Sequence, residues 1–427
     1  MDRPLRFCMI TTFYPPYNFG GDGIFVRQLS NELARRGHRV DVIHCIDAYR
    51  ALSHQEPKTY YGDHPNVTVH GLKSPFGFLS PLVTQQTGVP FFKSARIRQI
   101  LEQGFDVIHY HNISLVGGPK ILEYGRAIKL YTMHEYWLVC PTHMLFKFNR
   151  EPCTQRQCLP CSLIHKRPPQ WWRYMGLLET ATKHVDAFIA PSLFSKDVHE
   201  AGLNIPAVYL PNFVPSSDIA LPSTSRESTE KPYFLFVGRL ETLKGSQTLI
   251  PLFRRYRKAQ LWVAGTGGYE SRLRDLTEGS ANIRFLGYQS DQQLQALYRQ
   301  AVAVIVPSLY YENFPLVIIE AFRQQTPVIV RNLGGLPEIV KESNGGFVYN
   351  SDEELEAAMD QLLIDPSSRR DLGLLGYQTY KRKWTAEAHL QLYFGLIRQI
   401  AATRRQSITN GCNLPSDHRI SGEDVSL

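Results

Sequence analysis

The sequence has no hydrophobic run that approaches the roughly 20 residues needed to cross a membrane. Its opening residues, MDRPLRFCMITTFYPP, contain neither an apolar segment of signal-peptide length nor a small-residue cleavage site. The composition, 43% hydrophobic and 20% charged, is typical of a soluble globular protein. We therefore expect a cytoplasmic enzyme.

Acidic residues are in deficit, since the formal net charge is +8 and the pI is about 9.0. Such a balance favours an anionic partner. Between Lys147 and Arg173 six basic residues stand against the single Glu151, and the same stretch holds Trp171 and Trp172. This pattern suits contact with an anionic membrane, at the inner face of the cell membrane, and it also suits an ordinary solvated face. No nucleic-acid-binding motif accompanies the charge, so we expect no nucleic-acid partner.

Strand-like and helix-like segments alternate along the 427 residues, which predicts parallel sheets covered by helices on both faces. A polar, Ser- and Pro-rich stretch interrupts this alternation, and we interpret it as a linker between two Rossmann-like domains. The predicted parts are a first domain (1–213) with an insertion (136–175), the linker (214–232), a second domain (233–383), a final amphipathic helix (384–402) and a disordered tail (403–427).

Two loops carry groups suited to binding an anion. Gly20, Gly21 and Gly23 lie between the first strand and its helix, where they either admit a ligand or merely form a tight turn. Arg239 and Lys244 follow the first strand of the second domain. Because open α/β sheets bind ligands at the carboxyl ends of their strands, this pair is placed to hold a diphosphate.

The stretch LYYENFPLVIIEAF (309–322) sets two glutamates, Glu312 and Glu320, inside an apolar segment. Pro315 suits the first turn of a helix, with Asn313 as its cap. Eight residues of helix span about 12 Å, roughly the distance from a transferred group to the ribose of a nucleotide. A structural role remains open for each glutamate, as a complement to the helix dipole or as a member of a buried ion pair. The amides expected to face the diphosphate are those of Asn313, Phe314 and Leu316.

The Gly-rich loop, GRLETLKG, GTGG (265–268) and ENFPLVIIEA, in this order, closely resemble the retaining family 4 glycosyltransferases with the GT-B fold. The resemblance covers about residues 6–402. It implies two Rossmann-like domains that face across a cleft, with the final helix crossing back onto the first domain. It also implies a nucleotide-diphosphate sugar, such as a UDP- or GDP-sugar, as donor, and a saccharide or lipid-linked saccharide as acceptor in surface polysaccharide or glycoconjugate biosynthesis.

By the same resemblance, Arg239 and Lys244 would hold the donor diphosphate and stabilise the departing nucleotide. Glu320 would hydrogen-bond the ribose hydroxyls, and Glu312 would lie near the donor sugar.

His134, in TMHEYW, matches the family histidine that reaches the transferred sugar, and His111 would help shape the same cleft. Gly20 or Gly21 would leave room for phosphates or acceptor. Both histidines could instead be neutral residues satisfied at strand ends.

No Asp-x-Asp motif is visible, and an Arg/Lys pair can replace a divalent cation, so we expect catalysis without metal or other cofactor. The family reaction retains the anomeric configuration and depends on positioning and on charge stabilisation of the leaving diphosphate. A dehydrogenase is disfavoured because the Gly loop lacks the dinucleotide spacing. A non-catalytic nucleotide-sugar-binding protein and a GT-B nucleotide-sugar epimerase remain alternatives.

Four of the seven cysteines fall within 22 residues of the insertion, spaced C-x12-C-x4-C-x2-C. They are Cys140, Cys153, Cys158 and Cys161. In a cytoplasmic chain this spacing predicts a structural zinc site, away from the donor motifs. Free thiols packed in the loop and a redox-sensitive disulfide are the alternatives.

Overall fold

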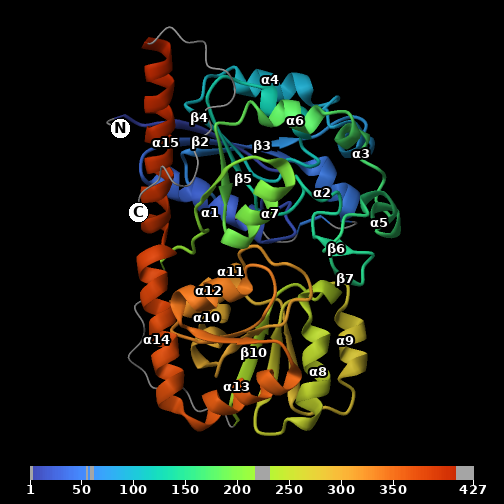
Figure 1. Cartoon of the computed structure of the whole chain (residues 1–427), viewed down its shortest axis with the longest axis vertical. Coiled ribbons are helices and arrows are strands. Elements are labelled where there is room, and N and C mark those ends of the chain that lie inside the picture. The colour runs from blue at the N-terminus through green and yellow to red at the C-terminus, as the bar shows by residue number, and fades with distance from the viewer. Residues whose placement is uncertain (1–2, 54–55, 58–61, 217–230, 410–427) are drawn as a thin grey trace. The chain divides into compact units, whose positions relative to one another are not determined.

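The computed structural model describes residues 3–53, 56–57, 62–216 and 231–409 (Figure 1). These residues divide into two compact units. The first contains the described residues up to 149, residues 153–211 and those from 389 onward. The second contains residues 150–152 and the described residues from 212 to 388.

The first unit is built on a seven-stranded sheet of order β3-β2-β1-β4-β5-β8-β9, with parallel pairing throughout. Its strands are β1 (Arg6–Ile10), β2 (Arg39–Cys45), β3 (Val67–Leu72), β4 (Val107–Tyr110), β5 (Ile128–Thr132), β8 (Ala187–Ala190) and β9 (Ala207–Tyr209). Its helices are α1 (Gly21–Arg35), α2 (Ile46–Leu52), α3 (Leu79–Thr87), α4 (Ser94–Leu101), η1 (Pro119–Glu123), α6 (Leu177–Thr182) and α7 (Leu193–Leu203). The insertion carries β6 (Phe146–Lys147), β7 (Glu151–Pro152), α5 (Cys158–Ile164) and η2 (Trp171–Tyr174).

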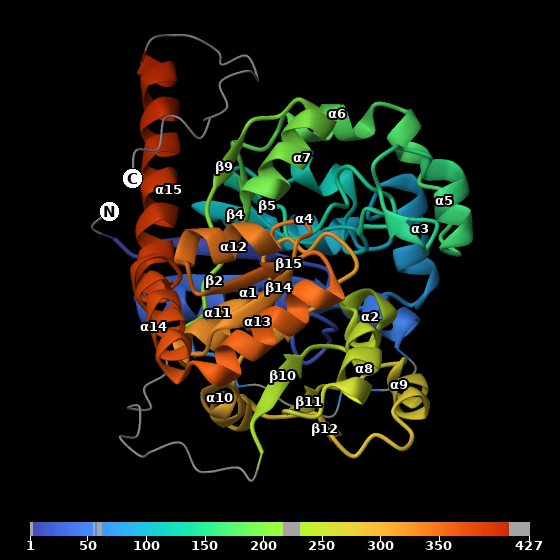
Figure 2. The same ribbon diagram turned by 60° about the horizontal axis from the view of Figure 1, so that its bottom comes forward.

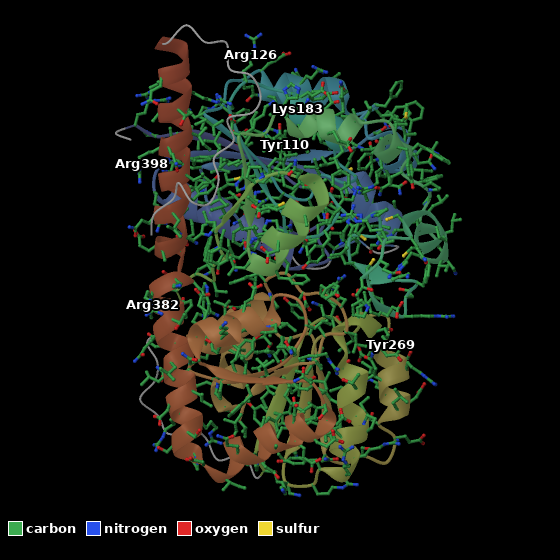
Figure 3. All side chains as sticks on the ribbon, viewed as in Figure 1. Tyr110, Arg126, Lys183, Tyr269, Arg382 and Arg398 are labelled. Atoms are coloured by element: carbon green, nitrogen blue, oxygen red, sulfur yellow. The ribbon has the colours of Figure 1, made fainter. Side chains whose placement is uncertain are left out.

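The strands β1, β2, β4, β5 and β8 are almost wholly buried, so both faces of the sheet are covered there, with alternate side chains pointing to opposite sides. On one face Ile10 and Tyr110 pack with α4, η1 and α6. Tyr110 lies within this core (Figure 3), and its hydroxyl donates to the Ile121 carbonyl at 3.2 Å. On the other face Phe7 stacks on Tyr393, with ring centroids 6.2 Å apart.

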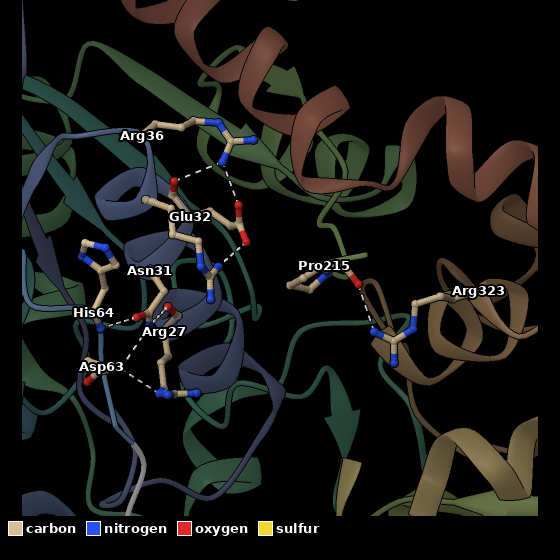
Figure 4. Close-up of polar contacts among 9 residues, drawn as sticks. Arg27, Asn31, Glu32, Arg36, Asp63, His64, Pro215 and Arg323 are labelled. Carbon is tan, nitrogen blue, oxygen red and sulfur yellow. Dashed lines mark hydrogen bonds and ion pairs between the residues drawn. The ribbon is translucent and has the colours of Figure 1, made fainter. Parts of the chain in front are cut away.

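Polar contacts tie the outer side of α1 to the segment before β3 (Figure 4). Arg27 pairs with Asp63 at 2.8 Å, and the Asn31 amide donates to the same carboxylate at 3.0 Å. The Asn31 carbonyl oxygen in turn accepts from the backbone N–H of His64. The first helix is thereby held at one end of the sheet.

The second unit has a six-stranded parallel sheet of order β12-β11-β10-β13-β14-β15. Its strands are β10 (Tyr233–Val237), β11 (Gln260–Ala264), β12 (Ile283–Gly287), β13 (Val304–Val306), β14 (Val328–Arg331) and β15 (Gly346–Tyr349). Its helices are η3 (Thr242–Lys244), α8 (Ser246–Arg255), α9 (Glu270–Leu276), α10 (Asp291–Gln300), α11 (Leu316–Arg323), α12 (Leu336–Ser343), α13 (Asp352–Ile364) and α14 (Pro366–Lys383).

Here too the strands alternate between two cores. Phe234 and Ile305 pack against α8, α9 and α13, whereas Leu235 and Val304 pack against α10, α11, α12 and α14. Arg323 of α11 holds the start of the unit by donating to the Pro215 carbonyl at 2.9 Å (Figure 4). The expected doubly wound α/β class is confirmed in each unit.

The final helix, α15 (Ala386–Thr409), belongs to the first unit from His389 onward. Tyr393 packs on the sheet, and Arg404 makes a two-pronged ion pair with Asp186. The helix therefore returns to the first domain, as expected. Our boundary was wrong, however, because residues 403–409 are helical rather than part of a disordered tail. The rest of the predicted tail and most of the linker (217–230) lie outside the described residues.

In chain order, both sheets begin with the pattern 3-2-1-4-5-6. The order reverses between the first and fourth strands, and ligands of such sheets bind beyond the carboxyl ends of the strands at this reversal. In the first unit this is the edge after β1 and β4, and in the second it is the edge after β10 and β13.

A close backbone approach in the second unit can be tested with glycine variants. Gly265 has φ +133°, and a Cβ there would lie 1.9 Å from the Gly238 carbonyl oxygen, whereas a Cβ on Gly268 would meet nothing within 4 Å. We expect Gly265→Ala to destabilise the protein by about 2–4 kcal/mol. Gly268→Ala, the matched control, should stay within about 0.5 kcal/mol. Urea unfolding of both variants measures this, and equal midpoints would contradict it.

Candidate active site

A buried ion pair lies at the strand-order reversal of the second unit. Lys244 Nζ is 2.6 Å from Glu312 Oε1, and the Glu312 side chain is only 8% exposed. Ser308 donates to the same carboxylate at 2.7 Å and the Tyr310 hydroxyl donates at 2.9 Å. Lys244 also donates to the Tyr310 oxygen at 3.1 Å. The four side chains form one connected polar cluster, which we call the lysine–glutamate cluster.

Backbone contacts hold the loops that carry this cluster. Leu309 N–H donates to the Leu243 carbonyl at 2.8 Å, which joins the loop after β13 to the loop after β10. Gly245 allows this approach, since a Cβ there would lie 2.0 Å from the Pro307 carbonyl oxygen. The Glu312 carbonyl accepts from Gly335 at 2.9 Å, which adds the loop after β14.

The cluster keeps both of its ionic groups charged. Burial acts to raise the pKa of Glu312, but the Lys244 charge and three hydrogen bonds outweigh it, so this pKa is lowered. Burial acts to lower the pKa of Lys244, and the Glu312 carboxylate reverses this, so the pKa of Lys244 is raised. The site therefore presents a permanent ammonium near neutral pH.

Arg239 lies in the same loop as Lys244 but is held differently. Its guanidinium pairs with Glu241 at 2.9 Å, and the two side chains are 48% and 40% exposed. Exposed pairs of this kind contribute little free energy. Arg239 can therefore leave Glu241 for a ligand at low cost.

Helix α11 begins at Leu316, with Pro315 in the capping position and no side-chain cap hydrogen bond. Our expectation that Asn313 caps this helix was wrong. Proline fixes an extended conformation on the residue before it, and Pro315 itself has ψ 115°, so helical geometry starts one residue later. Asn313 and Phe314 are buried ahead of the helix, and Leu316 is its first residue.

Glu320 lies within α11, as predicted, and accepts a hydrogen bond from the Tyr298 hydroxyl of α10 at 2.7 Å. Burial raises the pKa of this carboxyl, against the Tyr298 hydrogen bond and the nearby Arg323 charge. Glu312 and Glu320 thus have separate partners, and only Glu312 belongs to the lysine–glutamate cluster.

In the first unit His111 and His134 meet at the carboxyl ends of neighbouring strands. His111 Nδ1 lies 2.9 Å from His134 Nε2, and the rings stack with centroids 5.1 Å apart. The His111 Nε2 atom is buried and has no hydrogen-bond partner among the described residues. A buried unpaired ring nitrogen is costly, so this atom is a candidate for contact with a ligand.

The two predicted histidines belong to a larger group. His109 packs against His111, with ring centroids 4.0 Å apart. It bonds Thr132 Oγ1 at 2.7 Å and the Tyr393 hydroxyl at 3.0 Å. His389 of α15 contacts the Pro211 carbonyl at 2.8 Å.

The surroundings keep these rings neutral. Burial, followed by the charge that His389 would carry, lowers the pKa of His134 to about 3. Burial likewise lowers the pKa of His389 to about 4, and the pKa values of His109 and His111 lie well below the ordinary value.

Our expectation that all three glycines lie in a loop before the first helix was wrong, because Gly20 is the N-cap of α1 and Gly21 and Gly23 already belong to its first turn. A Cβ on Gly23 would lie 2.3 Å from the Asn18 side chain and 2.8 Å from the Phe13 carbonyl, so the close packing of the first helical turn against the preceding loop requires this glycine. A Cβ on Gly20 would meet only Asp22, at 3.4 Å, and one on Gly21 would meet nothing within 4 Å. Contacts within the protein therefore leave room for a larger side chain at positions 20 and 21 and do not explain why both residues are glycine.

The four cysteines of the insertion share the lining of one small cavity, of about 20 Å³. They are Cys140, Cys153, Cys158 and Cys161, and none is in a disulfide. The Phe148 N–H donates to Cys161 Sγ at 3.4 Å. As they stand, no three or more His, Cys, Asp or Glu side chains among the residues described form a group that could hold a metal ion.

The two adjacent tryptophans of the insertion differ in exposure. Trp171 is 57% exposed, whereas Trp172 is buried and donates from its indole nitrogen to the Gln85 carbonyl at 2.9 Å. Arg173 stacks on Trp172 and donates to backbone carbonyls of the insertion. Of the two tryptophans, only Trp171 is accessible to a partner, and membrane contact stays a prediction. No helix in the described part of the chain is long and apolar enough to cross a bilayer.

The chain matches two family models that follow one another. The model described as Glycosyltransferase Family 4 matches residues 19–218, and that described as Glycosyl transferases group 1 matches residues 220–379. The chain therefore belongs to these glycosyltransferases, as its motifs predicted.

Individual relatives agree with this class. The chain is 27% identical over 380 residues to a D-inositol 3-phosphate glycosyltransferase of Corynebacterium jeikeium, covering 83% of this chain and 86% of the relative. Among solved structures it resembles sucrose-phosphate synthase from Thermosynechococcus elongatus, with TM-score 0.71, 23% identity, and coverage of 93% and 100%. It also resembles Anabaena HepE in complex with UDP-glucose, with TM-score 0.59, 16% identity, and coverage of 94% and 100%. These structures support the GT-B fold.

Several hydrogen-bond and packing partners in these clusters were not predicted from the sequence. His109 could have been found, because residues 109 and 111 alternate on one face of a strand. For Tyr310, the only signal in the sequence is its position two residues before Glu312. Tyr298 and His389 come from distant segments and have no local signal.

The neutral histidines predict a stability that falls in acid. A lowered pKa means that the unfolded chain binds more protons than the folded one below about pH 6.5, so stability is lost as pH falls. For His134 the loss should be on the order of 1–2 kcal/mol at pH 5. We expect His134→Gln to reduce the decline of Tm between pH 7 and pH 5.

The exposed His184 provides the matched control, since His184→Gln should leave that decline unchanged. If His134→Gln and the wild type showed the same decline, the buried neutral assignment would be refuted.

Proposed function

We propose that this glycosyltransferase is a retaining enzyme that moves a sugar from a UDP- or GDP-sugar to a saccharide or lipid-linked saccharide. The acceptor would belong to surface polysaccharide or glycoconjugate biosynthesis at the cytoplasmic side of the membrane. The observation that carries the proposal is the lysine–glutamate cluster at the strand-order reversal of the second unit. The UDP-glucose complex of the similar protein HepE supports this choice of donor class.

Lys244 is the group we assign to the leaving diphosphate. An ammonium has three N–H donors. Glu312 and Tyr310 take two of them among the described residues, which leaves one for a phosphate oxygen. Arg239, released from its exposed partner, would add a two-pronged contact. Together they would stabilise the charge that develops as the bond between the anomeric carbon and the diphosphate breaks.

Glu312 orients Lys244 in this proposal and lies near the donor sugar, while Glu320 contacts the ribose. The backbone N–H groups of Asn313, Phe314 and Leu316, at and before the start of α11, would be directed toward the diphosphate.

The first unit would supply the remaining contacts. His134 would contact the transferred sugar, and the unpaired nitrogen of His111 would contact the donor or acceptor. Gly20 and Gly21, which packing does not require, would leave space for these groups.

The chemistry we propose takes place on one face of the sugar. An acceptor hydroxyl forms the new bond to the anomeric carbon as the diphosphate leaves, and a phosphate oxygen of the leaving group takes the hydroxyl proton. The anomeric configuration is then retained. Lys244 and Arg239 supply the positive charge in this scheme, without a divalent metal.

A donor screen with variants tests this function. We expect a UDP- or GDP-sugar to raise Tm and to be turned over with retention, read by NMR of the product anomer. Lys244→Ala should lower kcat/KM by at least about 100-fold, because it removes charge stabilisation of the leaving group. Glu312→Gln should lower kcat, because Lys244 loses its orienting charge.

Glu342→Gln is the matched control, since it breaks another Lys–Glu pair of the same unit, with Lys383, and should leave turnover unchanged. Absence of any Tm shift with UDP-, GDP- and ADP-sugars would refute the donor site. Binding without turnover would indicate a non-catalytic binder, and interconversion of sugars without an acceptor would indicate an epimerase.

For the cysteine cluster we propose a structural zinc ion. Four thiols around one cavity provide the donor set that tetrahedral zinc prefers. Their side chains would have to turn inward to coordinate it, and zinc binding commonly orders its own site. Such an ion would hold together a segment with little regular structure.

Metal analysis tests this assignment. Protein purified under reducing conditions should contain about one zinc ion per chain. The double variant Cys158→Ser and Cys161→Ser should lose it and lower Tm, whereas Cys45→Ala, outside the cluster, should keep it. Zinc-free protein from reducing purification would end the zinc proposal in favour of free thiols.

A further inference from the structure

Exposed apolar side chains concentrate on one part of the first unit. Ten of the eighteen large apolar side chains that are exposed in the described residues come from the lead-in to α3, the loop after it, α5 and the η2 region. They are Phe76, Phe78, Leu79, Phe91, Leu159, Leu163, Ile164, Trp171, Tyr174 and Met175. We call this set the apolar surface.

Helix α5 has its amphipathic pattern reversed. Its inward residues are Cys161 and Ser162, whereas Leu159, Leu163 and Ile164 are 45–59% exposed. A helix on a water-facing surface normally turns its apolar stripe toward the core. Three exposed aliphatic residues on one short helix therefore indicate contact with an apolar environment.

The segments of the apolar surface are tied to one another. Trp172 bonds the Gln85 carbonyl of α3 at 2.9 Å, and the Gln85 amide donates to the Pro168 carbonyl, between α5 and η2, at 3.0 Å. Helices α3 and α5 lie side by side in both Figure 1 and Figure 2. The exposed residues thus belong to one region rather than to scattered loops.

The charge of this region points to an anionic partner. Neither residues 64–101 nor residues 152–178 contain a single aspartate or glutamate. Lys73 and Lys166 are exposed within them. Apolar and aromatic side chains with basic residues and no acidic ones are the combination that binds the interface of an anionic bilayer.

A cavity of about 270 Å³ adjoins Phe78 and offers a place for a lipid phosphate. Arg50, Lys73 and Ser74 contribute to its lining. Asp47 also lines it, but its carboxylate accepts from the Ser74 N–H at 2.7 Å. Arg50 forms an ion pair with Glu56 at 2.7 Å, and both side chains are exposed, so an anionic headgroup can replace this contact.

We propose that the apolar surface docks the protein onto an anionic lipid bilayer. Trp171, Tyr174 and Met175 enter the interface, α5 lies with its aliphatic face toward the lipid, and Lys73 and Lys166 meet the headgroups. This docking concerns the α3–α5–η2 region alone and does not depend on the identity of the donor sugar or on the retaining mechanism.

Vesicle co-sedimentation of the full-length protein tests the proposal. We expect binding to phosphatidylcholine vesicles that contain about one third phosphatidylglycerol to be at least about tenfold tighter than to phosphatidylcholine alone. The double variant Trp171→Ser and Tyr174→Ser should weaken it at least about tenfold. Lys73→Glu with Lys166→Glu should abolish the preference for anionic vesicles.

The matched control is Tyr288→Ser with Ile364→Ser, since these side chains are 64% and 78% exposed on the second unit. This variant should bind vesicles like the wild type.

Three outcomes would overturn the proposal: no binding to anionic vesicles, equal loss in the control, or a dimer in solution that Trp171→Ser with Tyr174→Ser dissociates. The last would show that a second copy covers the surface. Because vesicle binding is measured without substrates, its failure would leave the proposed transferase reaction untouched.

Discussion

The ion pair between Lys244 and Glu312 is the interaction on which the polar edge of the second unit depends. Removing Lys244 would leave the buried Glu312 carboxylate uncompensated, which typically costs several kcal/mol. The two residues come from loops after different strands, so the pair also joins β10 to β13 at their carboxyl ends. Ser308 and Tyr310 satisfy the remaining carboxylate sites, so the lysine is oriented before any ligand arrives.

The parallel sheet explains why polar clusters occur at one edge of each unit. Strands covered on both faces must be apolar along their length, so side chains with chemistry are confined to the loops that follow them. Where the strand order reverses, the loops leave in opposite directions and open space between them. His111 and Lys244 both follow strands at such a reversal, each in its own unit.

Local patterns were sufficient to predict the elements but not the partners of their residues. The short apolar runs at 39–46 and 106–112 were correctly predicted as strands, because strands covered by helices on both faces are apolar along their length. Glu312 was singled out from sequence as a costly buried carboxylate, yet Ser308 and Tyr310 as its hydrogen-bond donors were not. Residues 403–409 continue the last helix, and Arg404 there meets Asp186, 218 residues away, a contact that no local pattern can reveal. Asn313 was misjudged as a cap because the restriction imposed by Pro315 outweighed its side-chain preference.

The insertion shows how one short helix can serve two requirements. Helix α5 turns Cys161 toward the shared cavity and leaves Leu163 and Ile164 outside. An element held by apolar packing has to bury its aliphatic residues, whereas an element held by sulfur ligands does not. If the thiols bind zinc, the helix is anchored from its inward face and its aliphatic face is free to meet lipid. With the proposed zinc ion, the inward Cys161 and the outward Leu163 would share one explanation, because the metal would take the place of a hydrophobic core.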